Sequence, residues 1–186
     1  KSLRALIMAG GGGTRFWPRS RQDMPKQFLA MRGDRSLLQE TADRLEGLVA
    51  PRDLMVVTGQ AHVARTREQL PEIPSDMVIG EPTGRDTAPC VALAAALLAR
   101  TDPDGVFFTC PADHVIEPAG LFRRALQAAA QVVEEHPRAF VTIGVPPTFP
   151  STGYGYIQRG QSLSGRLGVE AFRVRSFREK PPLEVA

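Results

Sequence analysis

Four consecutive glycines followed by a hydroxyl and a guanidinium side chain are the residues of this chain best suited to bind phosphate. The apolar run that ends at Ala9 leads into Gly10, Gly11, Gly12 and Gly13, and then into Thr14 and Arg15. Glycines lack a Cβ, so the backbone can approach a ligand closely and its successive N–H groups can converge on an anion. We therefore predict a phosphate-binding loop, with a plain glycine turn between a strand and a helix as the alternative.

Two common phosphate loops do not fit this pattern. A Walker loop requires Lys and then Ser or Thr after its last glycine, whereas Gly13 is followed by Thr14. A dinucleotide-binding fingerprint that starts at position 10 or 11 requires a third glycine at position 15 or 16, where this chain has Arg15 and Phe16. The loop must therefore bind phosphate in another way.

Lysine is rare in this chain and its placement is informative. Of the 23 basic Lys and Arg residues, only three are lysines, namely Lys1, Lys26 and Lys180. A lysine offers a compact point charge to a single phosphate oxygen, whereas the planar fork of arginine suits paired oxygens. Lys26 and Lys180 are therefore candidate phosphate ligands, and two ordinary surface lysines are the alternative.

The elements that must position these groups alternate between strand and helix. Apolar runs predict strands over 3–8, 54–58, 77–79, 106–109 and 140–145, and helical periodicity predicts helices over 36–48, 61–70, 87–100 and 121–135. We expect Ser36 to cap its helix and the apolar helix over 87–100 to be buried. This alternation predicts an α/β fold with a Rossmann-like, doubly wound, mostly parallel sheet flanked by helices. Beyond Pro146, short strands over 155–159 and 169–177 lie among turns.

Ligands of an open parallel sheet bind beyond the carboxyl ends of its strands, and charged residues of this chain fall there. Glu81 follows the third predicted strand and Asp113 the fourth. Mg²⁺ is typically held by one or two carboxylates together with phosphate oxygens and water, so Asp113 is a candidate Mg²⁺ ligand. A capping role in the next turn is the alternative for Asp113, and a structural hydrogen bond is the more common role for the neighbouring His114.

Composition limits the class of protein. The 186 residues, 42% of them hydrophobic, are enough for one domain with a substantial core, and the longest apolar stretch is well short of the ~20 residues that span a bilayer. This length predicts no membrane helix, so we expect no membrane partner. The net charge of +3 comes from scattered arginines, so we expect no nucleic-acid partner. With no secretion leader at the N-terminus and no Cys-x-x-Cys spacing, we expect Cys90 and Cys110 to be core thiols in a cytoplasmic protein.

Five segments, in order along nearly the whole chain, resemble the sugar-1-phosphate nucleotidyltransferase family. They are the glycine loop with Trp17-Pro18 and Pro25-Lys26-Gln27-Phe28-Leu29, Glu81-Pro82-Thr83-Gly84-Arg85-Asp86-Thr87-Ala88-Pro89, Pro111-Ala112-Asp113-His114, Thr152-Gly153-Tyr154-Gly155-Tyr156-Ile157, and Phe177-Arg178-Glu179-Lys180-Pro181. The details Trp17-Pro18 and Lys26-Gln27-Phe28 resemble the members that convert GTP and mannose 1-phosphate into GDP-mannose and pyrophosphate.

The resemblance implies a role for each candidate residue. The nucleotide would lie against Ala9 and the glycine loop, with the Gly11, Gly12 and Gly13 amides and Arg15 on the β- and γ-phosphates. Lys26 would act at the α-phosphate and Asp113 would hold Mg²⁺, which makes Arg15, Lys26 and Asp113 the expected catalytic residues. Glu81 would accept hydrogen bonds from guanine. Gly153, Glu179 and Lys180 would bind the sugar phosphate.

Some features depart from the family pattern or stay open. The family usually has Asn at the position of Asp86 and Ser at that of Ala112. It also continues beyond the Glu179-Lys180-Pro181 segment, so we expect residues 1–186 to be the N-terminal, nucleotide-binding part of a longer nucleotidyltransferase domain. The second metal-binding aspartate and the remainder of the sugar pocket would follow. The sequence leaves open whether the protein is a homo-oligomer.

Three other functions remain open from the sequence. A different sugar-1-phosphate nucleotidyltransferase, using dTTP or ATP, is the nearest alternative. A non-catalytic nucleotide-sugar sensor would keep the glycine loop but could lose Lys26, Asp113 or Lys180, and this chain keeps all three. A dinucleotide-binding oxidoreductase would need the missing third glycine and an acidic residue at the end of the second strand.

Overall fold

The computed structural model describes residues 3–11 and 17–186 of the chain. The chain divides into two compact units, Lys1–Arg123 and Arg124–Ala186, which are described separately below.

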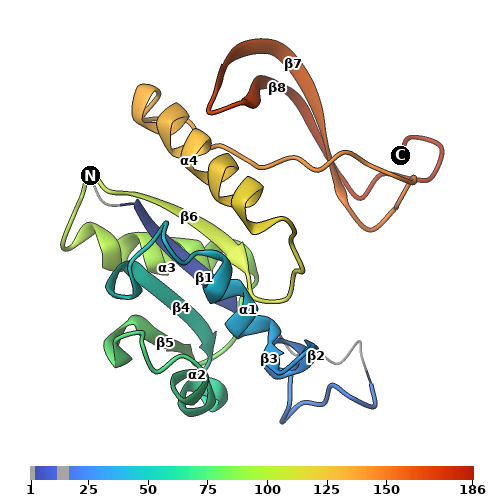
Figure 1. Ribbon diagram of the computed structural model, residues 1–186. Helices are drawn as coiled ribbons and strands as arrows, with labels where there is room; N and C mark the ends of the chain where they lie inside the picture. The colour runs from blue at the N-terminus through green and yellow to red at the C-terminus, as the bar shows by residue number, and fades with distance from the viewer. Residues whose placement is uncertain (1–2, 12–16) are drawn as a thin grey trace. The chain divides into compact units, whose positions relative to one another are not determined.

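A four-stranded parallel sheet forms the centre of the first unit (Figure 1). Its strands, in spatial order, are β5 (Val78–Glu81), β4 (Leu54–Gly59), β1 (Leu3–Ala9) and β6 (Val106–Pro111). Every neighbouring pair is parallel, with register pairs such as Ile7 with Val56 and Ile7 with Cys110. This arrangement confirms the predicted parallel α/β sheet.

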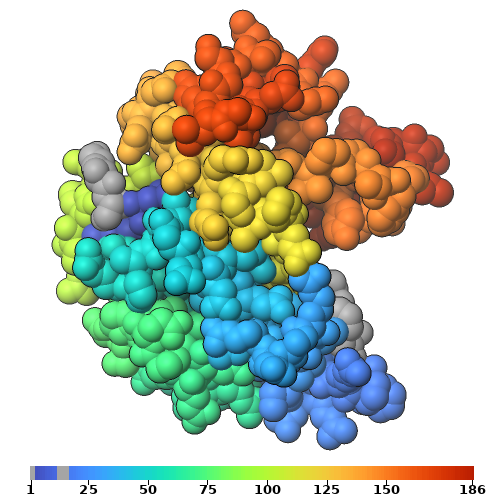
Figure 2. Space-filling view, viewed as in Figure 1, coloured from blue at the N-terminus to red at the C-terminus, as the bar shows by residue number. Residues whose placement is uncertain are grey.

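Helices connect these strands. The α-helices are α1 (Leu37–Arg44), α2 (Val63–Gln69), α3 (Thr87–Ala99) and α4 (Ala119–Glu135), the last of which crosses the boundary between the units. Short 3-10 helices are η2 (Lys26–Phe28), η3 (Pro51–Asp53), η4 (Gln60–His62) and η5 (Ser75–Met77), and a small hairpin consists of β2 (Ala30–Arg32) and β3 (Arg35–Ser36). Residues 17–24, between the glycine loop and η2, are mostly exposed, and Figure 2 shows them at the surface of the first unit.

The core lies on both faces of the sheet, since successive side chains of a strand point to opposite faces. On one face the strands pack against α3, in a cluster of six buried residues: Leu6, Met55, Val57, Cys90, Ala94 and Leu98. Ile7 and Val56, both 0% exposed, point to the opposite face, and α1 packs against β1. Strands buried on both faces explain the continuous apolar runs in the sequence.

Helix α3 is less buried than predicted. Cys90, Ala94 and Leu98, spaced four residues apart, are buried on the side that faces the sheet. Leu93 is 37% exposed, and Ala92 and Ala96 are exposed as well. The prediction of a buried helix was therefore wrong for the side of α3 that faces away from the sheet. Because α3 is apolar on all sides, its sequence does not indicate which side packs against the sheet and which stays exposed.

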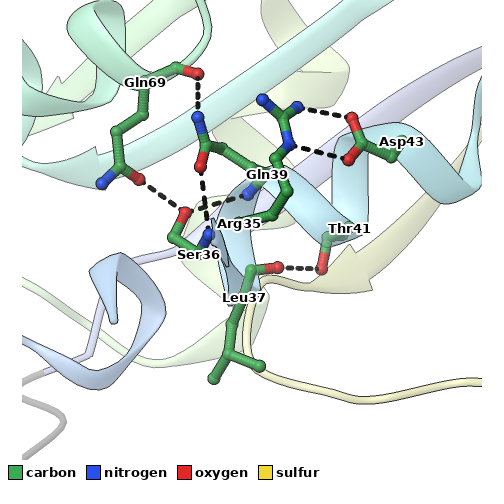
Figure 3. A network of polar contacts seen from close by, with 7 residues as sticks. All are labelled: Arg35, Ser36, Leu37, Gln39, Thr41, Asp43 and Gln69. Carbon is green, nitrogen blue, oxygen red and sulfur yellow. Dashed lines mark hydrogen bonds and ion pairs between the residues drawn. The ribbon is translucent and has the colours of Figure 1, made fainter. Parts of the chain in front are cut away.

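Helix α1 begins where the sequence predicts and ends earlier. Ser36 Oγ accepts a hydrogen bond from the Gln39 amide (3.2 Å), and Gln39 Oε1 accepts one from the Ser36 amide (3.0 Å), which is a complete capping box (Figure 3). The helix stops at Arg44 and continues as turns, whereas the prediction extended it to position 48. Gly47 has a φ of +78°, which favours glycine and does not continue an α-helix.

In the second unit, β7 (Gly155–Arg166) and β8 (Val169–Glu179) form a long antiparallel hairpin. Both strands were predicted, but each extends further than expected because they pair with each other along nearly their whole length. Arg166 Nε donates to Glu135 Oε1 (3.0 Å), which ties the hairpin to the C-terminal part of α4.

The strand predicted over 140–145 is absent. These residues have no regular structure, and Phe140 is 99% and Val145 84% exposed. The run has the β-branched and aromatic residues that strands favour, but a strand exists only through hydrogen bonds to a neighbour. Among the strands that the structure describes, β7 and β8 pair with each other, and the sheet order β5-β4-β1-β6 does not include this segment.

Within residues 3–11 and 17–186, no helix combines the length and the apolar character needed to cross a membrane.

Candidate functional site

The candidate site of the first unit lies along the carboxyl edge of the parallel sheet. From one side to the other, this edge contains Glu81 at the end of β5, Gly59 at the end of β4, Ala9 at the end of β1, and Asp113 two residues after β6. Neighbouring strands are about 4.8 Å apart, so the three spacings from β5 to β6 cover about 14 Å. An edge of this width can accommodate a nucleotide that lies across the strand ends.

At one side of this edge, Lys26 and Asp113 form an ion pair between Nζ and Oδ2. Lys26 comes from η2, and the loop that carries Asp113 is held by the Ala112 amide, which donates to the Met8 carbonyl (3.0 Å). The Lys26 and Asp113 side chains are 21% and 23% exposed, so the pair is accessible to a ligand but largely shielded from solvent. The structure therefore brings together two of the residues that the sequence predicts as catalytic.

At the other side, Glu81 reaches the start of the glycine loop. A Cβ added at Gly10 would lie 3.1 Å from Glu81 Oε2. Strands β5 and β1 are not neighbours, so the Glu81 side chain must extend past the end of β4 to come this close. Gly10 leaves room for this carboxylate, and a nucleotide on the glycine loop would lie beside Glu81.

Between these two sides, a buried polar junction holds the end of β1. Gln27 Nε2 donates to the Ala9 carbonyl (2.8 Å), and Thr58 Oγ1 donates to the same oxygen (3.2 Å). Gln27 is 3% and Thr58 0% exposed. No role was predicted for either residue, although the position of Gln27 directly after Lys26 is a signal that could have pointed to it.

Much of the predicted phosphate loop lies outside residues 3–11 and 17–186. Gly12, Gly13, Thr14 and Arg15 lie outside the described residues, and their predicted phosphate contacts stay predictions. Gly10 and Gly11 are described and exposed. An exposed backbone at the end of a central strand is where an anion can be bound by main-chain N–H groups.

The predicted sugar-phosphate ligands gather at the base of the hairpin in the second unit. Lys180 Nζ lies 3.2 Å from Glu179 Oε1, and both side chains are more than half exposed. The Lys180 amide donates to the Tyr154 carbonyl (3.1 Å), and the Gly153 amide donates to Ser151 Oγ (3.2 Å). Because the Gly153 amide already donates to Ser151, the backbone group of Gly153 that can bind a sugar hydroxyl is its carbonyl.

Lys180 also has an unusual backbone. Its φ is +41°, in a region that non-glycine residues rarely adopt. Such conformations cost free energy and are found preferentially at functional sites, where the surrounding structure holds them in place. Asp86 and Leu167 also have a positive φ, so the backbone does not single out Lys180, and its predicted role stays a prediction.

The two departures from the family pattern lie near the edge of the sheet. Asp86, where the family usually has Asn, is exposed, makes no side-chain cap to α3, and has a φ of +63°. Ala112, where the family usually has Ser, is 1% exposed, so a small apolar side chain fits its position. Neither residue contributes a described polar side-chain contact to the site.

Asp113 has the chemistry of a Mg²⁺ ligand, although it is not part of a preformed metal cage. Among the described residues, no group of three or more His, Cys, Asp or Glu side chains could hold a metal ion. His114 Nε2 lies 3.8 Å from Asp113 Oδ1, and this His is 61% exposed. A single, partly exposed carboxylate at the edge of the sheet fits Mg²⁺, which completes its shell with phosphate oxygens and water.

The two cysteines are buried free thiols, as predicted. Burial raises the pKa of Cys110 to about 12 and that of Cys90 to about 11. Both thiols are therefore protonated at neutral pH and contribute no nucleophile to the site.

Comparisons with known proteins show the family of the chain. The sequence pattern of the nucleotidyl transferase family matches residues 4–186. A mannose-1-phosphate guanylyltransferase of Escherichia coli (strain K12) is 41% identical over 188 residues, which cover 99% of this chain and 39% of that protein. The alginate biosynthesis protein AlgA of Pseudomonas aeruginosa is 42% identical over 180 residues, which cover 95% of this chain and 36% of that protein.

A solved structure is similar as well. The crystal structure of a protein described as mannose-1-phosphate geranyltransferase, from Thermus thermophilus, aligns with a TM-score of 0.84 and 36% identity. The alignment covers 100% of this chain and 52% of that one. Of the two curated relatives described above, the present chain spans about two fifths of the length.

Proposed function

Because the chain belongs to the nucleotidyl transferase family, we propose that it transfers GMP from GTP to mannose 1-phosphate, as the nucleotide-binding part of a longer enzyme. The products would be GDP-mannose and pyrophosphate. The names of the relatives support this choice of substrates. The single observation that carries the proposal is that Glu81, the start of the glycine loop, and the Lys26–Asp113 pair lie along one sheet edge.

In this reaction a phosphate oxygen of mannose 1-phosphate attacks the α-phosphorus of GTP. A new P–O bond forms there, the bond to the β-phosphate breaks, and its electron pair leaves with pyrophosphate. The nucleophile is already an anion near neutral pH, so no side chain has to remove a proton. Catalysis then rests on positioning and on neutralising negative charge.

Each described residue has one task in this mechanism. When GTP binds, Lys26 leaves its ion pair with Asp113 and pairs with an oxygen of the α-phosphate. There it neutralises the negative charge that shifts in the transition state. Asp113 would hold Mg²⁺, which when bound supplies charge neutralisation on the phosphates. Glu81 accepts hydrogen bonds from guanine N1–H and the exocyclic amine, and Lys180 binds the sugar phosphate with Glu179 on a sugar hydroxyl.

We place the protein in the cytoplasm, where nucleotides are available and thiols stay reduced. Two unpaired, buried cysteines support this compartment.

Nucleotide selectivity tests the proposal most directly. In a thermal-shift panel with MgCl₂, GTP and GDP-mannose at about a hundred times their dissociation constants should each stabilise the protein by about 2.7 kcal/mol. For a chain of this size, that corresponds to a rise of roughly 5–10 °C in Tm. ATP and dTTP at the same concentrations should give clearly smaller shifts. Equal shifts with all three triphosphates would contradict the assignment of GTP.

A further inference from the structure

We infer that Gln27 is a positioning residue for Lys26, because its buried amide ties the short helix that carries Lys26 to the end of β1. The inference rests on the proposed function, since it gives Gln27 a task in the reaction in which Lys26 acts at the α-phosphate.

The contact is short, buried and made to the strand that leads into the phosphate loop. Gln27 Nε2 donates to the Ala9 carbonyl over 2.8 Å, and Gln27 and Ala9 are 3% and 1% exposed. Thr58 Oγ1 of β4 donates to the same oxygen over 3.2 Å. The carbonyl at the end of β1 therefore receives one donor from η2 and one from the neighbouring strand. A buried hydrogen bond of this kind is costly to leave unmade.

The geometry of η2 connects this contact to Lys26. The Phe28 amide donates to the Pro25 carbonyl (3.1 Å) and the Leu29 amide to the Lys26 carbonyl (3.0 Å), so the segment is one tight 3-10 turn. With three residues per turn, adjacent side chains point in clearly different directions. Gln27 reaches the end of β1, while Lys26 reaches Asp113 beyond β6. This short turn thus bridges two parts of the sheet edge.

Other contacts hold the far end of the turn, at Phe28. The Phe28 ring lies 5.5 Å from the His62 ring, and the Arg65 guanidinium lies 5.8 Å from the centre of the Phe28 ring. Gln69 Nε2 donates to the Phe28 carbonyl over 3.4 Å. These contacts fix Phe28 against η4 and α2. A rotation of the turn about Phe28 would still move Lys26, and the bond to Ala9 opposes that rotation.

Loss of this bond should therefore lower the rate more than the affinity, since a displacement of about 1 Å at a catalytic group can cost a hundredfold in rate. We would introduce Gln27→Met, which keeps the length of the side chain and removes the donor, into the full-length enzyme. The expected result is a kcat lower by ten- to a hundredfold, with KM for GTP and mannose 1-phosphate changed by less than threefold.

Thr58→Val is the matched control, because it removes the other donor to the same carbonyl and leaves η2 untouched. It should lower the unfolding midpoint by an amount similar to Gln27→Met while kcat changes by less than threefold. If both variants lower kcat equally, the effect is general destabilisation and the inference is wrong. If Gln27→Met does not fold, Gln27→Asn, which keeps an amide one methylene shorter, gives the same test of kcat against KM.

A double-mutant cycle separates this inference from the proposed function. In a Lys26→Ala background, Gln27→Met should lower kcat by less than twofold further, because its effect passes through Lys26. A full additional loss would overturn the inference while the role of Lys26 stands. The inference would also be overturned if Gln27→Met left kcat unchanged while Lys26→Ala lowered kcat strongly. Absence of turnover with GTP in the unaltered enzyme would reject the proposed function, and the inference with it.

Discussion

Two side chains at opposite sides of the sheet edge define the candidate site at the residue scale. Glu81 lies against Gly10, and Lys26 lies against Asp113. The edge therefore has a carboxylate that can accept hydrogen bonds from a base and a cation that can neutralise a phosphate. These are different tasks, and substitutions should separate them.

If Glu81 binds guanine, its substitution should change the selectivity of the protein for the base of the nucleotide. Guanine offers two donors, N1–H and the exocyclic amine, and a carboxylate can accept from both. In Glu81→Gln one of them would face an amide N–H, which should cost about 1 to 3 kcal/mol and weaken GTP binding roughly ten- to a hundredfold. ATP binding should change little. Isothermal titration with both nucleotides measures this, with Glu68→Gln on the exposed side of α2 as a control. Equal losses for both nucleotides would contradict the role of Glu81.

The two lysines should differ in the kinetic constant that they affect. Lys26→Ala removes a charge that acts in the transition state, so kcat should fall by about a hundred- to a thousandfold with little change in KM for mannose 1-phosphate. Lys180→Ala should mainly raise that KM, because Lys180 binds the sugar phosphate in both ground and transition states. Steady-state kinetics of the full-length enzyme distinguish them, with Arg173→Ala on the exposed part of β8 as a control. The reverse pattern would overturn this division of tasks.

At the scale of elements, the start of α1 fixes the segment that follows the Lys26 turn. Figure 3 shows how the capping box extends into a wider network. Ser36 Oγ donates to Gln69 Oε1 (2.7 Å), and Gln39 Nε2 donates to the Gln69 carbonyl (3.0 Å). Arg35 pairs with Asp43 on the next turns of the helix. The network joins the start of α1 to the end of α2, and Gln69 in turn contacts Phe28 of η2.

Ser36→Ala should therefore destabilise the protein without changing the chemistry. Loss of an N-cap costs about 1 kcal/mol, which corresponds to a fall of roughly 2–4 °C in Tm for a chain of this size. Urea unfolding followed by circular dichroism measures the change in free energy. Ser75→Ala, at an exposed serine that caps no α-helix, is the control and should be close to neutral. A loss below about 0.3 kcal/mol for Ser36→Ala would show that the cap contributes little.

At the scale of the whole molecule, the buried thiols link stability to alkaline pH. Burial raises the pKa of Cys110 to about 12 from the ordinary value of 9.0, and a nearby positive charge on Arg44 offsets this only in part. The folded chain therefore keeps a proton that the unfolded chain releases above pH 9. The stabilisation is fully present below pH 9 and is lost as pH rises toward about 12.

This linkage predicts that the free energy of unfolding falls by about 1 kcal/mol between pH 9 and 10 on account of Cys110. In Cys110→Ala that part of the decline should disappear, although the variant should be less stable at pH 8. Urea unfolding at pH 8, 9 and 10 provides the measurement, with Cys90→Ala as the companion variant. An identical decline in Cys110→Ala and the unaltered chain would contradict the shifted pKa.

Most elements with a local signal were predicted correctly from the sequence. Alternating apolar runs placed the four strands of the parallel sheet, and Ser36 marked the start of α1, because side-chain periodicity and capping depend on residues a few positions apart. The same local rules placed Glu81 and Asp113 at strand ends. Membership of the family likewise came from short motifs and was confirmed by the comparisons.

Packing between elements that are distant in the sequence decides which groups meet. The Glu81 side chain crosses the end of β4 to reach Gly10, Lys26 pairs with Asp113, and Gln27 bonds to Ala9, and none of these contacts follows from spacing along the chain. The same reason explains the missing strand over 140–145 and the exposed side of α3. A strand needs a hydrogen-bonding neighbour and a helix face needs a covering layer, and both are supplied by packing between elements rather than by local sequence.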